Sequence, residues 1–67
     1  MNAPLPGRIE EIKFRDGEWV EEGRAVLIIE SMKMNIPLYA ERSGKIFYLV
    51  EEDEFVFRGK KLFIIGD

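Results

Sequence analysis

The segment Gly7-Arg8-Ile9-Glu10-Glu11-Ile12 has a counterpart in the second half of the chain, Gly44-Lys45-Ile46-Phe47-Tyr48-Leu49. Two further segments recur in the same order: residues 19–23 (Trp-Val-Glu-Glu-Gly) with 55–59 (Phe-Val-Phe-Arg-Gly), and residues 27–29 (Leu-Ile-Ile) with 63–65 (Phe-Ile-Ile). A duplicated half-domain predicts two equivalent sheets related by an approximate two-fold axis. Each half would bury its apolar face on the other, because neither has enough core alone. We therefore expect a single domain, residues 1–67, with half-repeats at about 1–32 and 34–67.

The apolar residues lie in short stretches, which predicts strands rather than helices. Ile, Val and aromatic residues dominate these stretches, and such residues favour β-strands. Gly-containing dipeptides between the stretches indicate turns: Asp16-Gly17, Glu22-Gly23, Ser43-Gly44 and Arg58-Gly59. We expect an all-β fold, a flattened barrel or sandwich of two four-stranded antiparallel sheets with eight short strands in all.

Local patterns make three finer predictions about the strands. Residues 34–40 alternate between apolar and other side chains, so one face should be buried, and Pro37 should lie on an edge or at a bulge. The pairs Ile9/Ile12 and Ile46/Leu49 have a spacing of three, which places both side chains inward only if a bulge or sharp twist intervenes; otherwise one of each pair is exposed. The aromatic pair Trp19 and Phe55, at matching repeat positions, is predicted to be core or cap rather than a platform for a ligand.

Composition excludes most kinds of self-contained catalysis. The chain has 67 residues, net charge −3, no cysteine and no histidine. It can form neither a Ser-His-Asp triad nor a Cys-His pair, and it lacks thiolate and imidazole ligands for a metal. The mildly acidic balance argues against nucleic-acid binding through a basic face. No apolar run approaches the ~18 residues of a membrane span, and Met1-Asn2-Ala3-Pro4 has no apolar signal core. Absence of cysteine fits a cytoplasmic location.

The junction between the halves, residues 30–35, joins two predicted strands and leaves almost no residues for a loop. Such a connection requires a tight hairpin, with Lys33 at or beside its tip. If the junction lies at one end of the barrel, both chain ends should lie at the other, and Lys33 should project away from them.

The segment Glu30-Ser31-Met32-Lys33-Met34 resembles the attachment site of biotinyl domains from biotin-dependent carboxylases, whose Met-Lys-Met hairpin carries biotin on its lysine. The resemblance covers nearly the whole chain. Residues 3–7 are similar to the family's opening strand and first turn, residues 17–23 to its repeated Gly-Asp-x-Val-x-x-Gly, and residues 40–46 to its Ala-x-x-x-Gly-x-Val.

Two features distinguish the chain from other members of that family. Glu18 replaces the usual Asp, and Glu52-Asp53 stands where the second half usually has Gly-Asp, although Asp tolerates the left-handed conformation better than most residues. The segment 13–18 is too short for the protruding thumb of bacterial acetyl-CoA carboxylase carriers. The chain therefore resembles the thumbless carriers.

The resemblance implies a biotin carboxyl carrier without catalysis of its own. Biotin would be attached covalently to Lys33, forming a swinging arm that carries carboxyl groups between biotin carboxylase and carboxyltransferase sites. The implied partners are a biotin protein ligase, then a biotin carboxylase and a carboxyltransferase. The domain itself is expected to be monomeric and to bind neither nucleic acid nor membrane.

Residues beside Lys33 have two interpretations each. Met32 and Met34 offer adaptable apolar surfaces for partner recognition; alternatively, Met34 begins the buried alternation and Met32 packs under the hairpin. Glu30 serves ligase recognition or pairs with a cation on a neighbouring strand. Ser31 supports the turn rather than contacting biotin. The acidic run 51–54 indicates a solvated turn and not a metal site.

Two other functions remain alternatives from the sequence. The first is a lipoyl carrier domain of a 2-oxoacid dehydrogenase-type system, which shares the fold but usually has Asp-Lys-Ala at the tip. The second is an unmodified structural or adaptor module of the same fold, which usually lacks the tip lysine.

Overall fold

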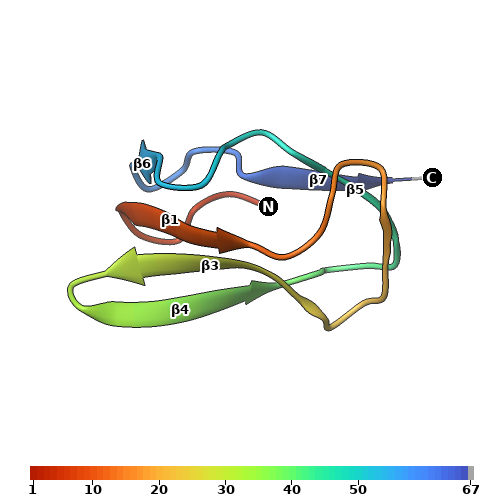
Figure 1. Ribbon diagram of the computed structural model, residues 1–67, viewed down its shortest axis with the longest axis horizontal. Coiled ribbons are helices and arrows are strands. Elements are labelled where there is room, and N and C mark those ends of the chain that lie inside the picture. The colour runs from red at the N-terminus through yellow and green to blue at the C-terminus, as the bar shows by residue number, and fades with distance from the viewer. Residues whose placement is uncertain (67) are drawn as a thin grey trace.

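The computed structural model describes residues 1–66 as two antiparallel sheets that pack against each other (Figure 1). One sheet has the strand order β4-β3-β1-β6 and the other β2-β5-β7. Within residues 1–66 no helix is long and apolar enough to cross a membrane. The strands are β1 (Gly7–Ile12), β2 (Trp19–Val20), β3 (Ala25–Ser31), β4 (Met34–Tyr39), β5 (Gly44–Tyr48), β6 (Phe55–Val56) and β7 (Phe63–Gly66).

The predicted all-β class is confirmed, but the second sheet has three strands instead of four. The missing strand corresponds to the first residues of the chain, where Asn2 pairs with Lys61 through a single isolated bridge. Pro4 and Pro6 follow at once, and proline has no N–H to extend a ladder. The pairing therefore stops after one bridge.

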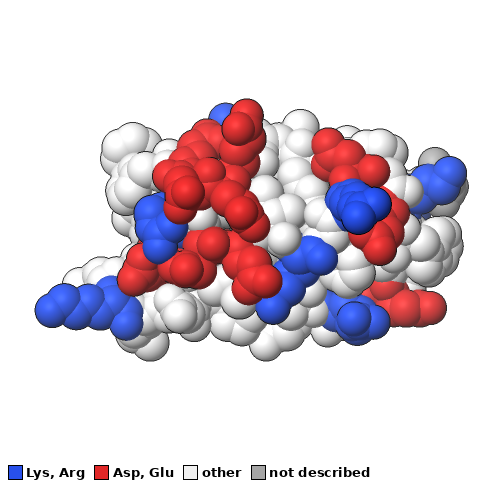
Figure 2. All heavy atoms as spheres, in the orientation of Figure 1, with Lys and Arg blue, Asp and Glu red and all other residues white. Residues whose placement is uncertain are grey.

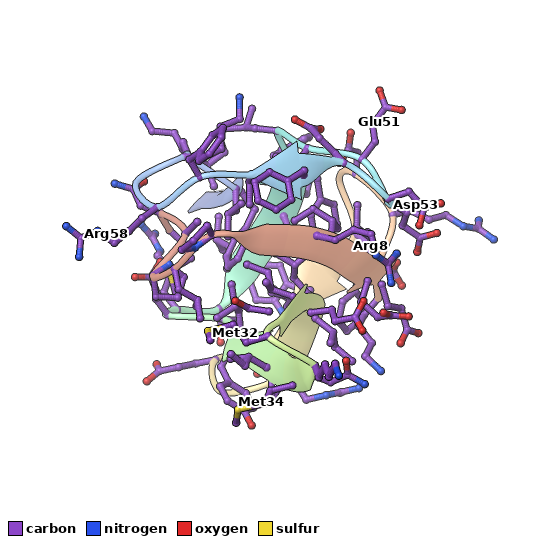
Figure 3. All side chains as sticks on the ribbon, turned by 90° about the vertical axis from the view of Figure 1, so that its left-hand side faces the viewer. Arg8, Met32, Met34, Glu51, Asp53 and Arg58 are labelled. Atoms are coloured by element: carbon purple, nitrogen blue, oxygen red, sulfur yellow. The ribbon has the colours of Figure 1, made fainter. Side chains whose placement is uncertain are left out.

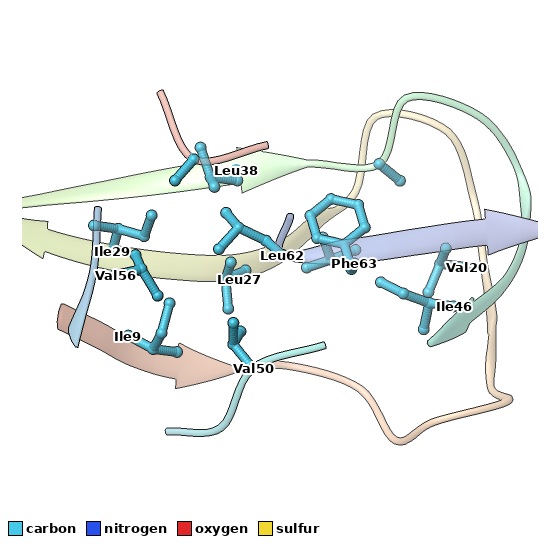
Figure 4. Close-up of a cluster of buried hydrophobic side chains, with 13 residues drawn as sticks. Ile9, Val20, Leu27, Ile29, Leu38, Ile46, Val50, Val56, Leu62 and Phe63 are labelled. Carbon is cyan, nitrogen blue, oxygen red and sulfur yellow. The ribbon is translucent and has the colours of Figure 1, made fainter. Parts of the chain in front are cut away.

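The core lies between the sheets and takes side chains from both (Figure 4). Its largest fully buried members come from β1, β3, β5 and β7 and from the loop before β7. They are Phe63, Ile9, Leu27, Ile29, Ile46 and Leu62. Because all of them are apolar, their burial from water is the main source of stability.

Hydrogen bonds link the two halves in matching pairs. The N–H of Ile9 donates to the carbonyl of Glu54 (2.8 Å). The equivalent N–H of Ile46 donates to the carbonyl of Glu18 (3.0 Å). Each half thus fastens the turn of the other, which is the arrangement expected for two-fold pseudo-symmetry.

The second-half turn keeps its shape without glycine. Asp53 has φ 72°, close to the φ of 85° at the matching Gly17. Asp is one of the few residues that adopt this left-handed conformation readily. The departure from the family pattern at Glu52-Asp53 therefore leaves the turn intact.

The bulge predicted in both halves occurs in one of them. The pairing of β1 with β3 shifts register between Ile9 and Glu11, so that Ile9 is buried and Ile12 half-buried. The pairing of β5 with β7 runs without a shift. Leu49 lies beyond the end of β5 and is exposed, so the inward prediction is wrong for that residue.

The prediction that Trp19 and Phe55 belong to the core is also wrong. Their side chains are 57% and 58% exposed, because each begins a two-residue strand whose other member, Val20 or Val56, points inward. Side chains alternate across a strand, so one of each pair must face solvent. Pro37, by contrast, lies exposed on the edge strand β4, as predicted.

The molecule is elongated, 33 × 18 × 17 Å, and the β3–β4 hairpin forms one of its long ends (Figure 1). β7 runs toward the opposite end, as predicted. The first residue lies instead near the middle, where the α-amino group of Met1 donates to the carbonyl of Phe63 (3.0 Å). Pairing of the first residues with the loop before β7 holds the chain start there.

Candidate functional site

The hairpin between β3 and β4 turns within two residues, Met32 and Lys33. Ser31 pairs with Met34, and the two residues between them have φ values of 51° and 66°. Positive φ at both central positions defines a type I′ turn, which matches the twist of a hairpin but favours Asn and Gly. Met and Lys here each carry a conformational penalty of roughly 1–2 kcal/mol. Strain of this kind in the backbone is often associated with functional sites.

The hairpin begins at the end of β3, one of the two inner strands of its sheet. β3 is rich in β-branched residues and lies between β4 and β1. Leu27 and Ile29 point into the core, and Ser31 continues the same face with only 8% of its surface exposed. The tip is therefore held out on a rigid support.

The base of the hairpin is fastened to the segment before β1. The Ser31 hydroxyl donates to the Pro6 carbonyl (2.6 Å). Gly7 packs so closely that a Cβ there would lie 2.5 Å from the Glu30 carbonyl oxygen. Ser31 thus anchors the hairpin to Pro6, and only glycine fits at residue 7. The sequence singled out Gly7 only as the start of the repeated segment and as part of a turn, and it gave no indication of this contact.

Arg8 joins three carboxylates beside the hairpin base. Its guanidinium contacts Glu30 (2.8 Å), Glu10 and Asp53 (2.7 Å). Arg8 and Asp53 are labelled in Figure 3. The hydrogen bond with Glu30 raises the pKa of Arg8, so the guanidinium stays charged. Arg8 and Glu30 are direct partners in the β1–β3 ladder. Of the two interpretations of Glu30, this favours pairing with a cation on a neighbouring strand. Sequence reasoning missed Arg8, because the register that brings these charges together is a tertiary feature.

The side chains at the tip are exposed. Met32 is 90% exposed and Met34 63%, so neither packs into the core. Both packing interpretations are wrong, since the buried alternation in β4 starts only with half-buried Ile36. Lys33 is exposed as well, and its amine forms no ion pair with any residue in the range 1–66. An exposed amine in a fixed position is suited to acylation by a second protein.

Met32 and Met34 lie on opposite sides of the hairpin. Viewed from the hairpin end, Met32 faces β1 and Met34 faces away (Figure 3). On the Met32 side a groove of about 370 Å³ is lined by Pro6, Gly7, Arg8, Glu30, Ser31, Met32, Lys33 and Phe55. Lys33 thus borders this groove.

A second hollow lies along the acidic turn, away from the hairpin. Asp16, Glu51, Glu52 and Glu54 form its rim, and acidic side chains dominate this face of the molecule (Figure 2). Within residues 1–66 no three carboxylates converge to hold a metal ion. Tyr48, at its floor, donates its hydroxyl to the Val26 carbonyl (2.7 Å), and burial raises the pKa of Tyr48 to about 12. The phenol of Tyr48 therefore stays protonated at neutral pH.

Known proteins resemble this chain over most of its length. A family model described as "Biotin-requiring enzyme" matches residues 1–65. The chain is 37% identical over 63 residues to the biotin/lipoyl attachment protein of Bacillus subtilis (strain 168), covering 92% of this chain and 86% of that protein. It is 36% identical over 66 residues to the biotin carboxyl carrier protein of acetyl-CoA carboxylase from Solanum lycopersicum, covering 97% and 94%.

Solved structures show the same fold as part of larger enzymes. The crystal structure of the Kluyveromyces lactis urea carboxylase matches with a TM-score of 0.87 and 30% sequence identity. The match covers 97% of this chain and 6% of that enzyme. The chain therefore corresponds to one small unit of that multi-part carboxylase.

Proposed function

Because the chain belongs to the biotin/lipoyl attachment family, we propose that Lys33 is the residue that carries its biotin. The chain is a biotin carboxyl carrier, as its matches to carrier proteins and carboxylases indicate. The observation that supports Lys33 most directly is its place at the exposed tip of a strained two-residue turn within Glu30-Ser31-Met32-Lys33-Met34. We propose that the chain, residues 1–67, is one carrier domain with half-repeats at about 1–32 and 34–67.

Attachment requires chemistry at the lysine amine that a ligase supplies. A base on the ligase takes a proton from the ammonium, and the neutral Nζ attacks the carbonyl carbon of the biotinyl-adenylate. The N–C bond forms as the bond to the phosphate oxygen breaks, releasing AMP. The resulting amide is neutral, so the positive charge at the hairpin tip is lost. We place this reaction, which consumes ATP, in the cytoplasm.

The residues around Lys33 have different roles in presenting its amine to a second protein. The Ser31–Pro6 hydrogen bond and the close fit of Gly7 hold the hairpin in one orientation. Met32 and Met34 offer soft apolar surface on either side of the amine for a ligase and for carboxylase partners to grip. Glu30, paired with Arg8, presents its carboxylate in a fixed position.

The bound biotin would supply the atom to which a carboxyl group is transferred, and the protein would supply the tether. The domain presents its hairpin at one end of a 33 Å long body, so an arm on Lys33 starts at the end of the molecule, where another protein can approach it. We propose that the domain, monomeric and without catalysis of its own, serves a biotin carboxylase and a carboxyltransferase in turn. The tether replaces diffusion of a free cofactor with a high effective concentration.

A lipoyl carrier and an unmodified adaptor of the same fold were the alternatives. Matches to carboxylases and to a biotin carboxyl carrier favour biotin over lipoate. The exposed lysine at the turn gives an adaptor no evident advantage.

The test is incubation of the full chain with a biotin protein ligase, biotin and ATP, followed by streptavidin blotting. Lys33→Arg should lose biotin incorporation completely, because the guanidinium is not nucleophilic near neutral pH. Its circular dichroism and melting temperature should stay unchanged, because the side chain is exposed. Incorporation by the variant, or no incorporation by the wild type, would contradict the proposal.

A further inference from the structure

The groove beside Lys33 has the size of a small-molecule site. Its volume of about 370 Å³ lies within the range of roughly 300–1,000 Å³ for ligand pockets. On the premise that Lys33 carries biotin, we propose that this groove holds the bicyclic head of the biotinyl arm between its visits to partner active sites. The arm would then alternate between a docked and a free state.

The walls of the groove are apolar and exposed. Met32, with 90% of its surface exposed, forms one wall and Phe55 of β6 the other. The Phe57 ring packs edge-on against Phe55, with centroids 5.2 Å apart, and so restrains it. A thioether side chain and an aromatic face suit the apolar, sulfur-containing ring of biotin.

The polar end of the groove offers hydrogen-bonding groups that complement the second ring of biotin, the ureido ring. A ureido ring presents one carbonyl acceptor and two N–H donors. Arg8 gives three of its five N–H donors to Glu10, Glu30 and Asp53, so two remain for the ureido carbonyl. Glu30 accepts from Arg8 through one oxygen (2.8 Å) and offers its second oxygen as an acceptor for a ureido N–H. The cross-strand register fixes this pair next to Phe55, because Arg8 pairs with Glu30 on one side and with Phe55 on the other.

The ligand is tethered at the edge of its own site. Lys33 itself lines the groove, so the head of its arm never diffuses away, and weak contacts are enough for substantial occupancy. The groove is open to solvent, so the head of the arm can leave it. A carrier needs this property, because its arm must leave for each transfer.

The experiment uses the biotinylated full chain, labelled with ¹³C and ¹⁵N while the biotin is unlabelled. Isotope-filtered NMR should show cross-peaks from the biotin ring protons to the Phe55 ring and the Met32 methyl group. Phe55→Ser should abolish the cross-peaks and at least double the rate of capture by streptavidin. Trp19→Ser is the matched control, because Trp19 occupies the equivalent position in the other half and is 57% exposed against 58% for Phe55.

Intact mass of each sample separates the two proposals. A wild-type sample without added biotin would overturn both the attachment at Lys33 and the docked state. A fully biotinylated sample without cross-peaks, or cross-peaks that survive in Phe55→Ser, would overturn the groove alone. If Phe55→Ser fails to fold, Met32→Ser provides the same comparison, since it removes the opposite wall from an exposed turn position.

Discussion

Met32 combines an exposed side chain with a backbone conformation that is unusual for methionine. It is the most exposed large hydrophobic residue in the part of the chain that the structure describes. Exposed apolar side chains are common, but one that borders a reactive amine in a backbone conformation disfavoured for Met has another reason to be there. The role that we propose for it is recognition by a second protein.

At this scale we expect Met32→Ala to separate recognition from stability. The melting temperature should change little, because exposed substitutions alter stability by about 0.5 kcal/mol or less. The kcat/KM of biotin ligation should fall about tenfold, which corresponds to loss of about 1.4 kcal/mol of apolar contact with the ligase. Steady-state ligation kinetics and thermal denaturation of the same samples measure both. Met32→Leu should retain most activity, and a large melting shift with unchanged kinetics would restore the packing interpretation.

The hairpin is the element in which sequence and structure can be compared most closely. Its tight turn was predictable because two apolar runs leave no room for a loop between them. Its anchoring was not, since the contact of Ser31 with Pro6 and the ladder pairing of Arg8 with Glu30 depend on how β1 and β3 align. A pattern along the chain identifies strands, but the register across strands appears only in the folded molecule.

The strained turn predicts a conflict between stability and function at the level of this element. Replacement of the tip by Asn-Gly, in the double variant Met32→Asn/Lys33→Gly, should stabilise the domain by about 1 kcal/mol, because these residues favour a type I′ turn. The melting temperature should rise by roughly 4–8 °C, while biotin incorporation is lost.

Differential scanning calorimetry of the wild type, the double variant and Lys33→Arg tests this prediction. Lys33→Arg serves as the control, because it removes the amine and keeps a side chain of the same kind in the turn. A double variant no more stable than the wild type would show that the turn carries no strain.

On the scale of the whole molecule, pseudo-symmetry explains both the successes and the failures of the sequence interpretation. The repeat indicated paired sheets correctly, because matching segments such as those beginning at Gly7 and Gly44 make matching contacts. It misled where the halves differ: the bulge at Ile9 has no equivalent in the pairing of β5, and the first residues form one bridge instead of a strand. Local proline content and strand length decide these differences.

Tyr48 provides the clearest test of how the two sheets are joined. It lies on β5 and donates its hydroxyl to Val26 of β3 in the other sheet (2.7 Å). Burial raises its pKa from 10.0 to about 12, so the folded state holds the phenolic proton more tightly than the unfolded state. The resulting stabilisation is fully present below pH 10 and is lost as the pH rises through about 12. Allowing for partial solvent screening, we expect it to amount to about 1 kcal/mol.

Urea denaturation at pH 7 to 12 measures this contribution. Tyr48→Phe should be less stable by about 1 kcal/mol at pH 7, because the Val26 carbonyl loses its donor, and its stability should fall less steeply above pH 10. Tyr39→Phe, at an exposed position on β4, is the control. Parallel pH profiles for Tyr48→Phe and the wild type would contradict the role given to this hydroxyl.

The most direct test of the central claim is the location of the attached group. The full chain is loaded by a biotin protein ligase and digested, and its peptides are sequenced by tandem mass spectrometry. We predict biotin on Lys33 alone, with Lys13, Lys45, Lys60 and Lys61 unmodified. Biotin on any of those four lysines in place of Lys33, or a chain that the ligase leaves unmodified, would contradict the account.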